Sequence, residues 1–177
     1  MRTMIDQRTF VKAIAFGARG CSSCTCDPCD CNPCNCGDSL EPGYPRWRVS
    51  GYQVSETAAE NAHLAGQIII AVSQPVDEGD CSHWQEVILV DEAAAESQVG
   101  DLLERFEAHL DSMPAEVEHR RSSRRAVYRA SIAYQEPLLS VSFSPDQAML
   151  LREGGDSSQP PRAWAYTGPV ATRGNFV

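Results

Sequence analysis

The sequence predicts an α+β fold, in which a mostly antiparallel β-sheet carries one main amphipathic helix, with an irregular cysteine-rich segment before them. Three observations lead to this prediction. Short stretches either alternate between apolar and polar residues or run continuously apolar, as strands do. One longer stretch repeats its apolar residues at helical spacing. Near the N-terminus, cysteines crowd into a segment without large apolar side chains, which cannot bury a core of its own.

Strands are predicted from two kinds of pattern. Residues 67–73 and 86–90 are continuous apolar runs, which are typical of buried strands. Alternation of inward and outward residues predicts three further strands, at residues 46–54, 125–134 and 138–144. Glu136 and Pro137 separate the last two, so we expect these two strands to form an antiparallel pair.

One helix is predicted over residues 92–111. Asp91 offers an N-cap before it, and Glu92 is favourable at the positive end of the helix. Gly100 costs the helix about 1 kcal/mol, and the Met-Pro pair at 113–114 ends it. The apolar stripe that would pack on the sheet consists of Val99, Leu102, Leu103, Phe106 and Leu110.

The chain divides into four parts by composition. Residues 1–20 form an N-terminal arm, and residues 21–45 form the cysteine-rich segment with its Pro- and Gly-rich exit. Residues 46–151 form the α+β domain. Residues 152–177 are rich in Gly, Pro and Ser and predict an extended C-terminal tail. Aromatic residues alternate with Ala in this tail, so it could dock as an edge strand or on a partner.

Charge and hydropathy exclude two classes of partner. The chain of 177 residues carries 24 acidic and 15 basic residues, which gives a formal net charge of −9. Binding to nucleic acid needs a basic face for the phosphates, so we expect no nucleic acid as the main partner. No stretch approaches the roughly 18 apolar residues of a membrane helix, so we expect no membrane insertion.

The N-terminus only partly resembles an export signal. QRTFVKA is close to a twin-arginine core, but Gln7 stands where the first Arg belongs, and Arg19 interrupts a short apolar run. We therefore expect residues 10–16 to enter the core as a strand or short helix, and the protein to be cytoplasmic. Export through this imperfect signal stays open as the alternative.

The cysteines have a regular spacing. Seven of the eight alternate C-x-x-C and C-x-C steps with a period of five residues. C-x-x-C gives two thiolates a bite that fits a tetrahedral metal ion, and C-x-C brings neighbouring thiolates onto a shared ion. The segment locally resembles a metallothionein and predicts a thiolate cluster for Cu(I) or Zn(II). The predicted ligands are Cys21, Cys24, Cys26, Cys29, Cys31, Cys34 and Cys36.

Two other interpretations of these cysteines stay open. A disulfide framework fits the even number of cysteines, but seven cysteines in one run would close very small loops, which stabilise least. An iron–sulfur cluster is less favoured, because the cysteine spacings of ferredoxins do not occur in the sequence. A reducing cytoplasm also favours metal-bound or free thiols over disulfides.

The eighth cysteine belongs to a second constellation. Cys81 and His83 lie two residues apart, shortly before the strand at 86–90. They could complete the thiolate site or form a second metal site. The alternatives are a small buried Cys beside a surface His, and a nucleophilic Cys that lacks an orienting third group. His63 and His109 are expected to be structural.

Signatures of common enzymes are missing from the sequence. It contains no Gly-rich phosphate loop, no G-x-S-x-G, no H-E-x-x-H and no dinucleotide fingerprint, so an ordinary enzyme is not expected. The one basic run, HRRSSRR at residues 119–125, is expected to be a solvated hairpin end. Alternatively, this run could bind an anion, an acidic partner or the negative surface of the protein itself.

The body of the chain resembles the bacterial family called domain of unknown function 1326, over about residues 64–145. In that family a Trp precedes a strand, the strand ends in an acidic residue, and an Ala-rich segment with a Gln opens the helix. The matching residues are Trp84, Asp91, Ala94 and Gln98. CDCNPCNCG, from Cys29 to Cys36, is similar to the cysteine motif of the family. The family's Trp-x-x-x-Gly precedes its cysteines, whereas WRVSG follows them here. The resemblance implies metal handling.

The sequence thus predicts a protein that binds a soft metal ion, Cu(I) or Zn(II), for sequestration or transfer. Two other classes of function remain. One is an accessory or structural subunit that docks on a larger complex through the cysteine-rich arm and the aromatic tail at Trp164 and Tyr166. The other is a thiol redox protein that uses C-x-x-C pairs, although no thioredoxin-like βαβ unit surrounds them.

Overall fold

A computed structural model describes residues 13–20, 47–54, 63–77, 80–112, 124–155 and 161–176. Within these ranges the chain is mostly β-sheet with one helix, in agreement with the sequence. The elements are β1 (Ala13–Gly20), β2 (Trp47–Val54), β3 (Ile68–Asp77), β4 (Asp80–Asp91), α1 (Glu96–Ser112), β5 (Ala126–Gln135), β6 (Leu138–Phe143), β7 (Leu150–Arg152), β8 (Trp164–Pro169) and β9 (Ala171–Phe176). No helix in these ranges is long and apolar enough to cross a membrane.

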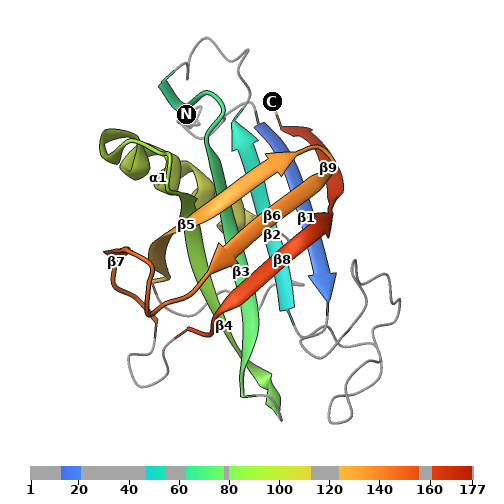
Figure 1. Ribbon diagram of the computed structural model, residues 1–177, viewed down its shortest axis with the longest axis vertical. Helices are drawn as coiled ribbons and strands as arrows, with labels where there is room; N and C mark the ends of the chain where they lie inside the picture. Colours follow the sequence, from blue (N-terminus) through green and yellow to red (C-terminus); the bar gives the residue numbers. More distant parts are fainter. Residues whose placement is uncertain are drawn as a thin grey trace, which may run out of the picture.

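A single sheet contains all of these strands, in the order β8-β6-β5-β4-β3-β2-β1-β9, with β7 beside β5. Neighbouring strands are antiparallel except β4 and β5, which are parallel. A parallel pair needs a crossover connection, and α1 provides it. β8 and β9 stand at opposite ends of the order, yet only Val170 separates them along the chain. The sheet is accordingly curled (Figure 1).

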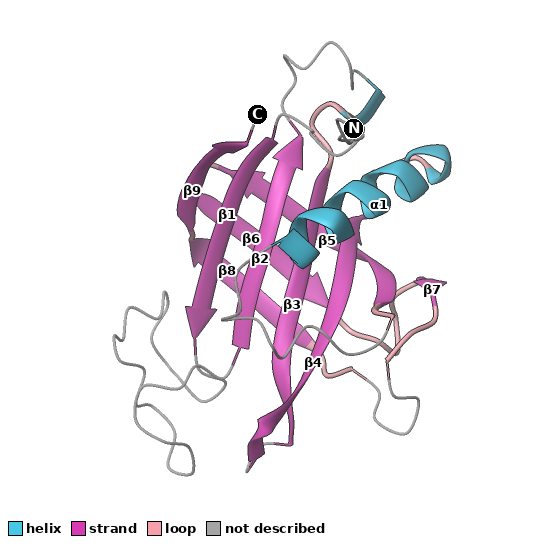
Figure 2. Ribbon diagram, turned by 180° about the vertical axis from the view of Figure 1, so that it is seen from behind, coloured by secondary structure: helices cyan, strands magenta, loops and turns pink. Residues whose placement is uncertain are grey.

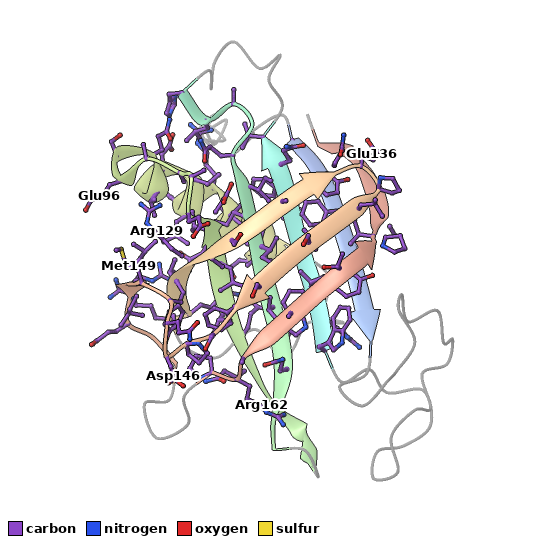
Figure 3. The ribbon with its side chains drawn as sticks, viewed as in Figure 1. Glu96, Arg129, Glu136, Asp146, Met149 and Arg162 are labelled. Atoms are coloured by element: carbon purple, nitrogen blue, oxygen red, sulfur yellow. The ribbon has the colours of Figure 1, made fainter. Side chains whose placement is uncertain are left out.

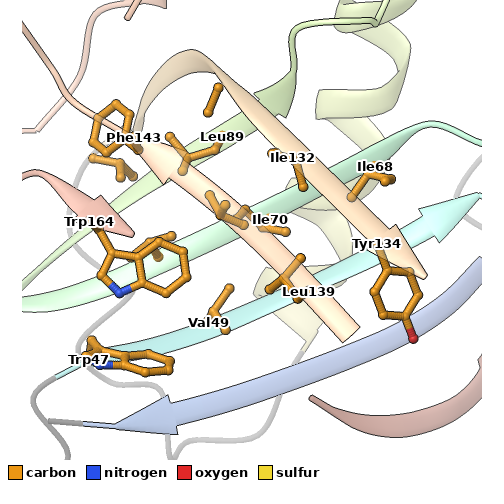
Figure 4. Packing of buried hydrophobic residues seen from close by; sticks show 14 of the residues in the cluster. Trp47, Val49, Ile68, Ile70, Leu89, Ile132, Tyr134, Leu139, Phe143 and Trp164 are labelled. Atoms are coloured by element: carbon orange, nitrogen blue, oxygen red, sulfur yellow. The ribbon is translucent and has the colours of Figure 1, made fainter. Parts of the chain in front are cut away.

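Curling divides the sheet into two layers. β5, β6 and β8 cross in front of β1 to β4 (Figure 1), and α1 lies across the back, over β3 and β4 (Figure 2). One hydrophobic core fills the space between the layers and includes Phe16, Ile70 and Trp164. A second core lies between the back layer and the helix and includes Ile69 and Phe106. Figure 4 shows residues of the first core.

The two cores explain why β3 has a continuous apolar sequence. Ile70 and Val72 pack between the layers, whereas Ile69 and Ala71 pack toward α1, so both faces of the strand are buried. The neighbouring strand β4 repeats this arrangement with its own apolar run. β6 has only one covered face: Leu139 and its alternate neighbours are buried, and the residues between them are exposed. The continuous runs thus correspond to strands that are buried on both faces, and the alternation at 138–144 corresponds to a strand with one buried face. β2 differs from the expectation, because its sequence predicts alternation but the strand is buried on both faces over most of its length.

Helix α1 begins four residues later than the sequence predicts. Asp91 was expected as the N-cap, but its carboxylate accepts the N–H of Ala93 at 3.4 Å and closes a turn before the helix. Ala95 precedes the first helical residue, Glu96, and donates its N–H to Oε1 of Gln98 at 3.1 Å. This is half of a capping box, made by a Gln at the third helical position. The expected apolar stripe faces the second core.

Both outer parts of the chain contribute strands to the sheet. Residues 13–20, from the expected N-terminal arm, form β1, and Phe16 is buried between the layers. The C-terminal residues, expected as an extended tail, contribute β8 and β9, and β8 docks as an edge strand on β6. Trp164 is only 6% exposed. Burial of such a side chain contributes about 2 kcal/mol or more, enough to order a segment whose Gly and Pro content favours irregular structure.

Gly100→Ala is expected to raise the free energy of unfolding by about 1 kcal/mol. Gly100 is exposed inside α1, and a Cβ there would have no other atom within 4 Å, so only the helix propensity changes. Gly51→Ala is the contrasting variant, because its Cβ would lie 2.5 Å from Cγ2 of Ile70. We expect it to cost about 2 kcal/mol. Urea unfolding followed by circular dichroism measures both, and changes of the same sign would contradict this account.

Candidate metal site at one end of the sheet

The cysteine-rich segment belongs to the connection between two neighbouring strands. β1 ends at Gly20 and β2 begins at Trp47, and these two residues pair directly across the antiparallel ladder. Residues 21–46 form the connection, and they lie outside the described part of the chain. The seven predicted ligands from Cys21 to Cys36 are all within it. The sheet therefore holds the two ends of this connection side by side.

The β3–β4 hairpin extends past the same end of the sheet. Arg48, Ser73 and Glu86 form the last row that pairs across β2, β3 and β4. Beyond this row β3 and β4 continue as a two-stranded hairpin, in which Asp77 pairs with Asp80 near the tip. The hairpin is visible at the lower end of the sheet in Figure 1. It projects beyond β2, so its tip stands apart from the cores.

Cys81 and His83 are positions of this projecting hairpin. Both lie in β4. His83 is three residues beyond Glu86 (86 − 83), or about 10 Å along a strand, and Cys81 is five residues beyond it (86 − 81), or about 17 Å. Their side chains are not among those that the structure describes. β1 and β4 are three strand spacings apart, or about 14 Å. Cys21 directly follows Gly20, so a few residues of extended chain would span this separation.

An aromatic cluster lies where the connection enters β2. The ring centroid of Trp47 is 5.3 Å from that of Trp164 and 5.1 Å from that of Tyr166 (Figure 4). Both indoles are buried. Among the described residues, no group accepts a hydrogen bond from Nε1 of Trp164. Because Trp47 directly follows the connection and pairs with Gly20 at its other end, its fluorescence should respond to metal binding in the connection.

A buried ion pair lies one row from the start of the hairpin. Nε of Arg125 donates to Oε1 of Glu86 at 2.6 Å, and the hydroxyl of Ser73 donates to Oε2 of the same carboxylate at 2.7 Å. Nη2 of Arg125 also reaches Oδ1 of Asp111 in α1 at 3.2 Å. Burial alone would lower the pKa of Arg125, but the attraction of Glu86 and the hydrogen bonds outweigh it and raise the pKa.

This pair corrects one expectation from the sequence. The basic run at residues 119–125 was expected to be solvated, yet Arg125 is only 8% exposed and is paired with the protein's own acidic groups. Residues 119–123 lie outside the described ranges. The signal that could have revealed the pair is Glu86 itself, the one charged residue of the predicted strand at 86–90, because the four residues that follow it are buried.

A second arginine continues the network along α1. The guanidinium of Arg152 in β7 forms a bidentate pair with Glu107, with a distance of 3.0 Å from Nη1 to Oε2. It also donates to the backbone carbonyl of Arg125 at 2.8 Å. The network thus joins the C-terminal half of α1 to β5 and β7. Its two guanidinium groups each lie between the helix and the sheet and pair with carboxylates of α1, so the role of the network is to position the helix.

The exposed His63 joins a surface cluster on the other side of α1. Its Nε2 lies 2.9 Å from Oδ2 of Asp101. The other carboxylate oxygen of Asp101, Oδ1, accepts a hydrogen bond from Nε of Arg105 at 2.8 Å. Burial tends to raise the pKa of Asp101, but the hydrogen bonds from Arg105 and His63 outweigh this effect and lower it. The stabilisation is therefore complete above the unfolded-state pKa and is lost as pH falls through the lowered value.

The remaining described histidine is structural, as the sequence indicates. The ring of His109 packs edge-on against Tyr52 at 5.7 Å and stacks near Phe106. Burial raises the pKa of Tyr52, which keeps its hydroxyl neutral. Throughout the described ranges, no three His, Cys, Asp or Glu side chains come together as a metal site.

Comparison with known proteins gives no match to this chain. No protein-family model matches it. The curated proteins give no match either, and neither do the solved structures.

Arg125→Met is expected to lower the free energy of unfolding by about 3 kcal/mol or more, because it leaves the carboxylate of Glu86 buried without its cation. Arg105→Met is a matched control, since it removes a partly exposed pair with Asp101 and should cost less than about 1 kcal/mol. Urea unfolding followed by circular dichroism measures both variants. Equal losses would contradict the structural role assigned to the buried pair.

Proposed function

We propose that this protein binds soft metal ions, Cu(I) or Zn(II), through a thiolate cluster, for sequestration or transfer. The observation that carries the proposal is the place of the cysteines in the fold. They occupy a connection whose two ends, Gly20 and Trp47, are paired neighbours in a sheet. The hairpin with Cys81 and His83 extends from the same end of that sheet.

Pairing of the two ends favours metal binding by this connection. A chain whose ends are already held together has lost part of its conformational freedom, so ordering it around an ion costs less than ordering a free tail. The seven thiolates from Cys21 to Cys36 would hold the ions in C-x-x-C and C-x-C units. Cys81 and His83 would add a thiolate and an imidazole from the hairpin. Transfer would proceed by stepwise replacement of one thiolate by another.

The other two functions find less support in the fold. An accessory subunit was expected to dock partly through the aromatic tail, but Trp164 is buried against Trp47 inside the protein. A thiol redox protein would use one reactive C-x-x-C pair, whereas the C-x-x-C step recurs three times in this segment. Repetition of the step suits several ions bound together better than a single exchange reaction.

Protein purified without chelator is expected to contain several Cu or Zn ions per chain, with its thiols reduced. Elemental analysis by mass spectrometry, combined with a count of free thiols under denaturing conditions, measures both. Acidification should release the metal, because the thiolates become protonated. A variant with Ser at the seven positions from Cys21 to Cys36 is the control, and it should keep its circular dichroism spectrum and lose the metal. Metal-free protein with few free thiols would instead establish a disulfide framework.

The Cys81→Ser and His83→Ala variant is expected to bind Cu(I) or Zn(II) about tenfold more weakly, or more so, because it removes a thiolate and an imidazole from the end of the sheet. His63→Ala is the matched control, since His63 is exposed and bonded to Asp101 on α1, away from the hairpin. Competition with a chelator of known affinity measures each variant. Equal affinities of this variant and the wild-type protein would remove the hairpin from the site and leave the seven-cysteine cluster to be tested separately.

A further inference from the structure

β8 presents an open strand edge. It is the last strand in the order of the sheet, and it pairs with β6 on one side. On its other side no strand of the described chain pairs with it. An unpaired edge offers backbone donors and acceptors to any strand that can reach it.

The pairing with β6 determines which backbone groups of β8 are free. Val170 donates its N–H to the carbonyl of Pro137, which lies opposite it, at 2.8 Å. Hydrogen-bonded pairs recur at every second residue, so Trp164, Tyr166 and Gly168 direct their N–H and C=O groups toward β6. The N–H and C=O groups of the residues between them point away from it. Two residues therefore direct backbone groups outward at the edge of the sheet, where no backbone group of the described residues pairs with them: Ala165 and Thr167.

The edge has a defined end. Pro169, the next residue with outward groups, has no N–H to donate, and its carbonyl accepts a hydrogen bond from the hydroxyl of Tyr166 at 2.7 Å. No charged side chain occurs between Trp164 and Pro169. Proteins that keep a sheet edge unpaired usually place charges, prolines or bulges along it. Ala165 and Thr167 carry none of these protections.

The outer face of the front layer is uncharged as well. Nine exposed residues of β5, β6 and β8 form a grid of three rows on this face, and none of them is charged, although the chain carries a net charge of −9. Charged residues such as Glu136, Asp146 and Arg162 lie around its margin (Figure 3). The grid consists of Ser131, Ser142 and Ala165; Ala133, Ser140 and Thr167; and Gln135, Leu138 and Pro169.

We propose that β8 pairs in antiparallel fashion with β8 of a second copy of this chain. A twofold axis through Tyr166 places Ala165 opposite the partner's Thr167 and Thr167 opposite the partner's Ala165. Each of these two pairs exchanges two hydrogen bonds, so all four free groups of each edge are satisfied. The edge is complementary to itself, and no like charges meet across it. These two properties make a second copy of the chain a partner that fits the edge without any other element.

The resulting dimer would have a continuous layer of six strands with an uncharged outer face. Its interface consists of one short strand from each subunit, well below the roughly 800 Å² per partner of a standard interface. The dimer therefore forms with modest affinity and depends on protein concentration. The proposal does not depend on metal binding, because none of the residues of β8 that carry it is a candidate metal ligand.

Sedimentation velocity of the full chain over a wide range of concentrations tests the proposal. The wild-type protein should pass from monomer to dimer as its concentration rises. Thr167→Pro should raise the dissociation constant about tenfold or more, since it removes an outward N–H from each subunit without removing a bond to β6. Thr167→Val is the matched control, because it loses the same side-chain contact with Ser140 but keeps the N–H. It should dimerise like the wild-type protein.

Two further results decide the interpretation. Ala133→Lys adds a charge to the same outer face in β5, away from the edge, and should leave the dissociation constant unchanged. If this variant disrupts the dimer, the two copies pack face to face, which would overturn the proposal. Hydrogen exchange of the wild-type protein should slow at Ala165 and Thr167 as the concentration rises. A chain that stays monomeric, or exchange at these two amides that does not change with concentration, would also overturn it.

Discussion

Burial of β3 and β4 on both faces is the constraint from which the rest of the structure follows. Strands of this kind need a layer on each side, and the chain supplies them as α1 behind and β5, β6 and β8 in front. A sheet can cover its own central strands only by curling, which is why the order of strands runs from β8 to β9 around the core. The crossover through α1 makes β4 and β5 a parallel pair, at the boundary between the two layers.

The same constraint decides where the two-sided burial ends. Glu86 lies in the last row of the central strands, and its charge needs a partner because its side chain has lost its water. Arg125, the residue before β5, provides this partner and also donates a hydrogen bond to Asp111 of the helix. Beyond this row β3 and β4 continue past the described part of β2 as a two-stranded hairpin, and Cys81 and His83 are positions of that hairpin.

Much of this fold could be predicted from the sequence, because pattern and burial coincide in it. The runs at 67–73 and 86–90, and the alternation at 138–144, correspond to β3, β4 and β6. The start of α1 could not be predicted, since the Ala residues at 93–95 favour a helix that begins before Ala95, although the helix begins after it. The alternation of aromatic residues with Ala left β8 open as an edge strand, although the Gly and Pro around it favoured an extended tail. The burial of Trp164, a tertiary effect, decides between the two. The candidate metal ligands were found from their spacing, but their common anchorage at one end of the sheet depends on long-range pairing that no local pattern contains.

The single residue between β8 and β9 has a mechanical consequence. Val170 joins the two opposite margins of the sheet, its side chain is buried between the layers, and its N–H is bonded to Pro137. Peeling β9 away from β1 would pull directly on β8, so neither margin can detach while the other stays in place. Fraying, which normally begins at the last strand of a sheet, is thereby converted into a cooperative opening of both margins together. Resistance to proteolysis at the C-terminus would then report the stability of the whole sheet.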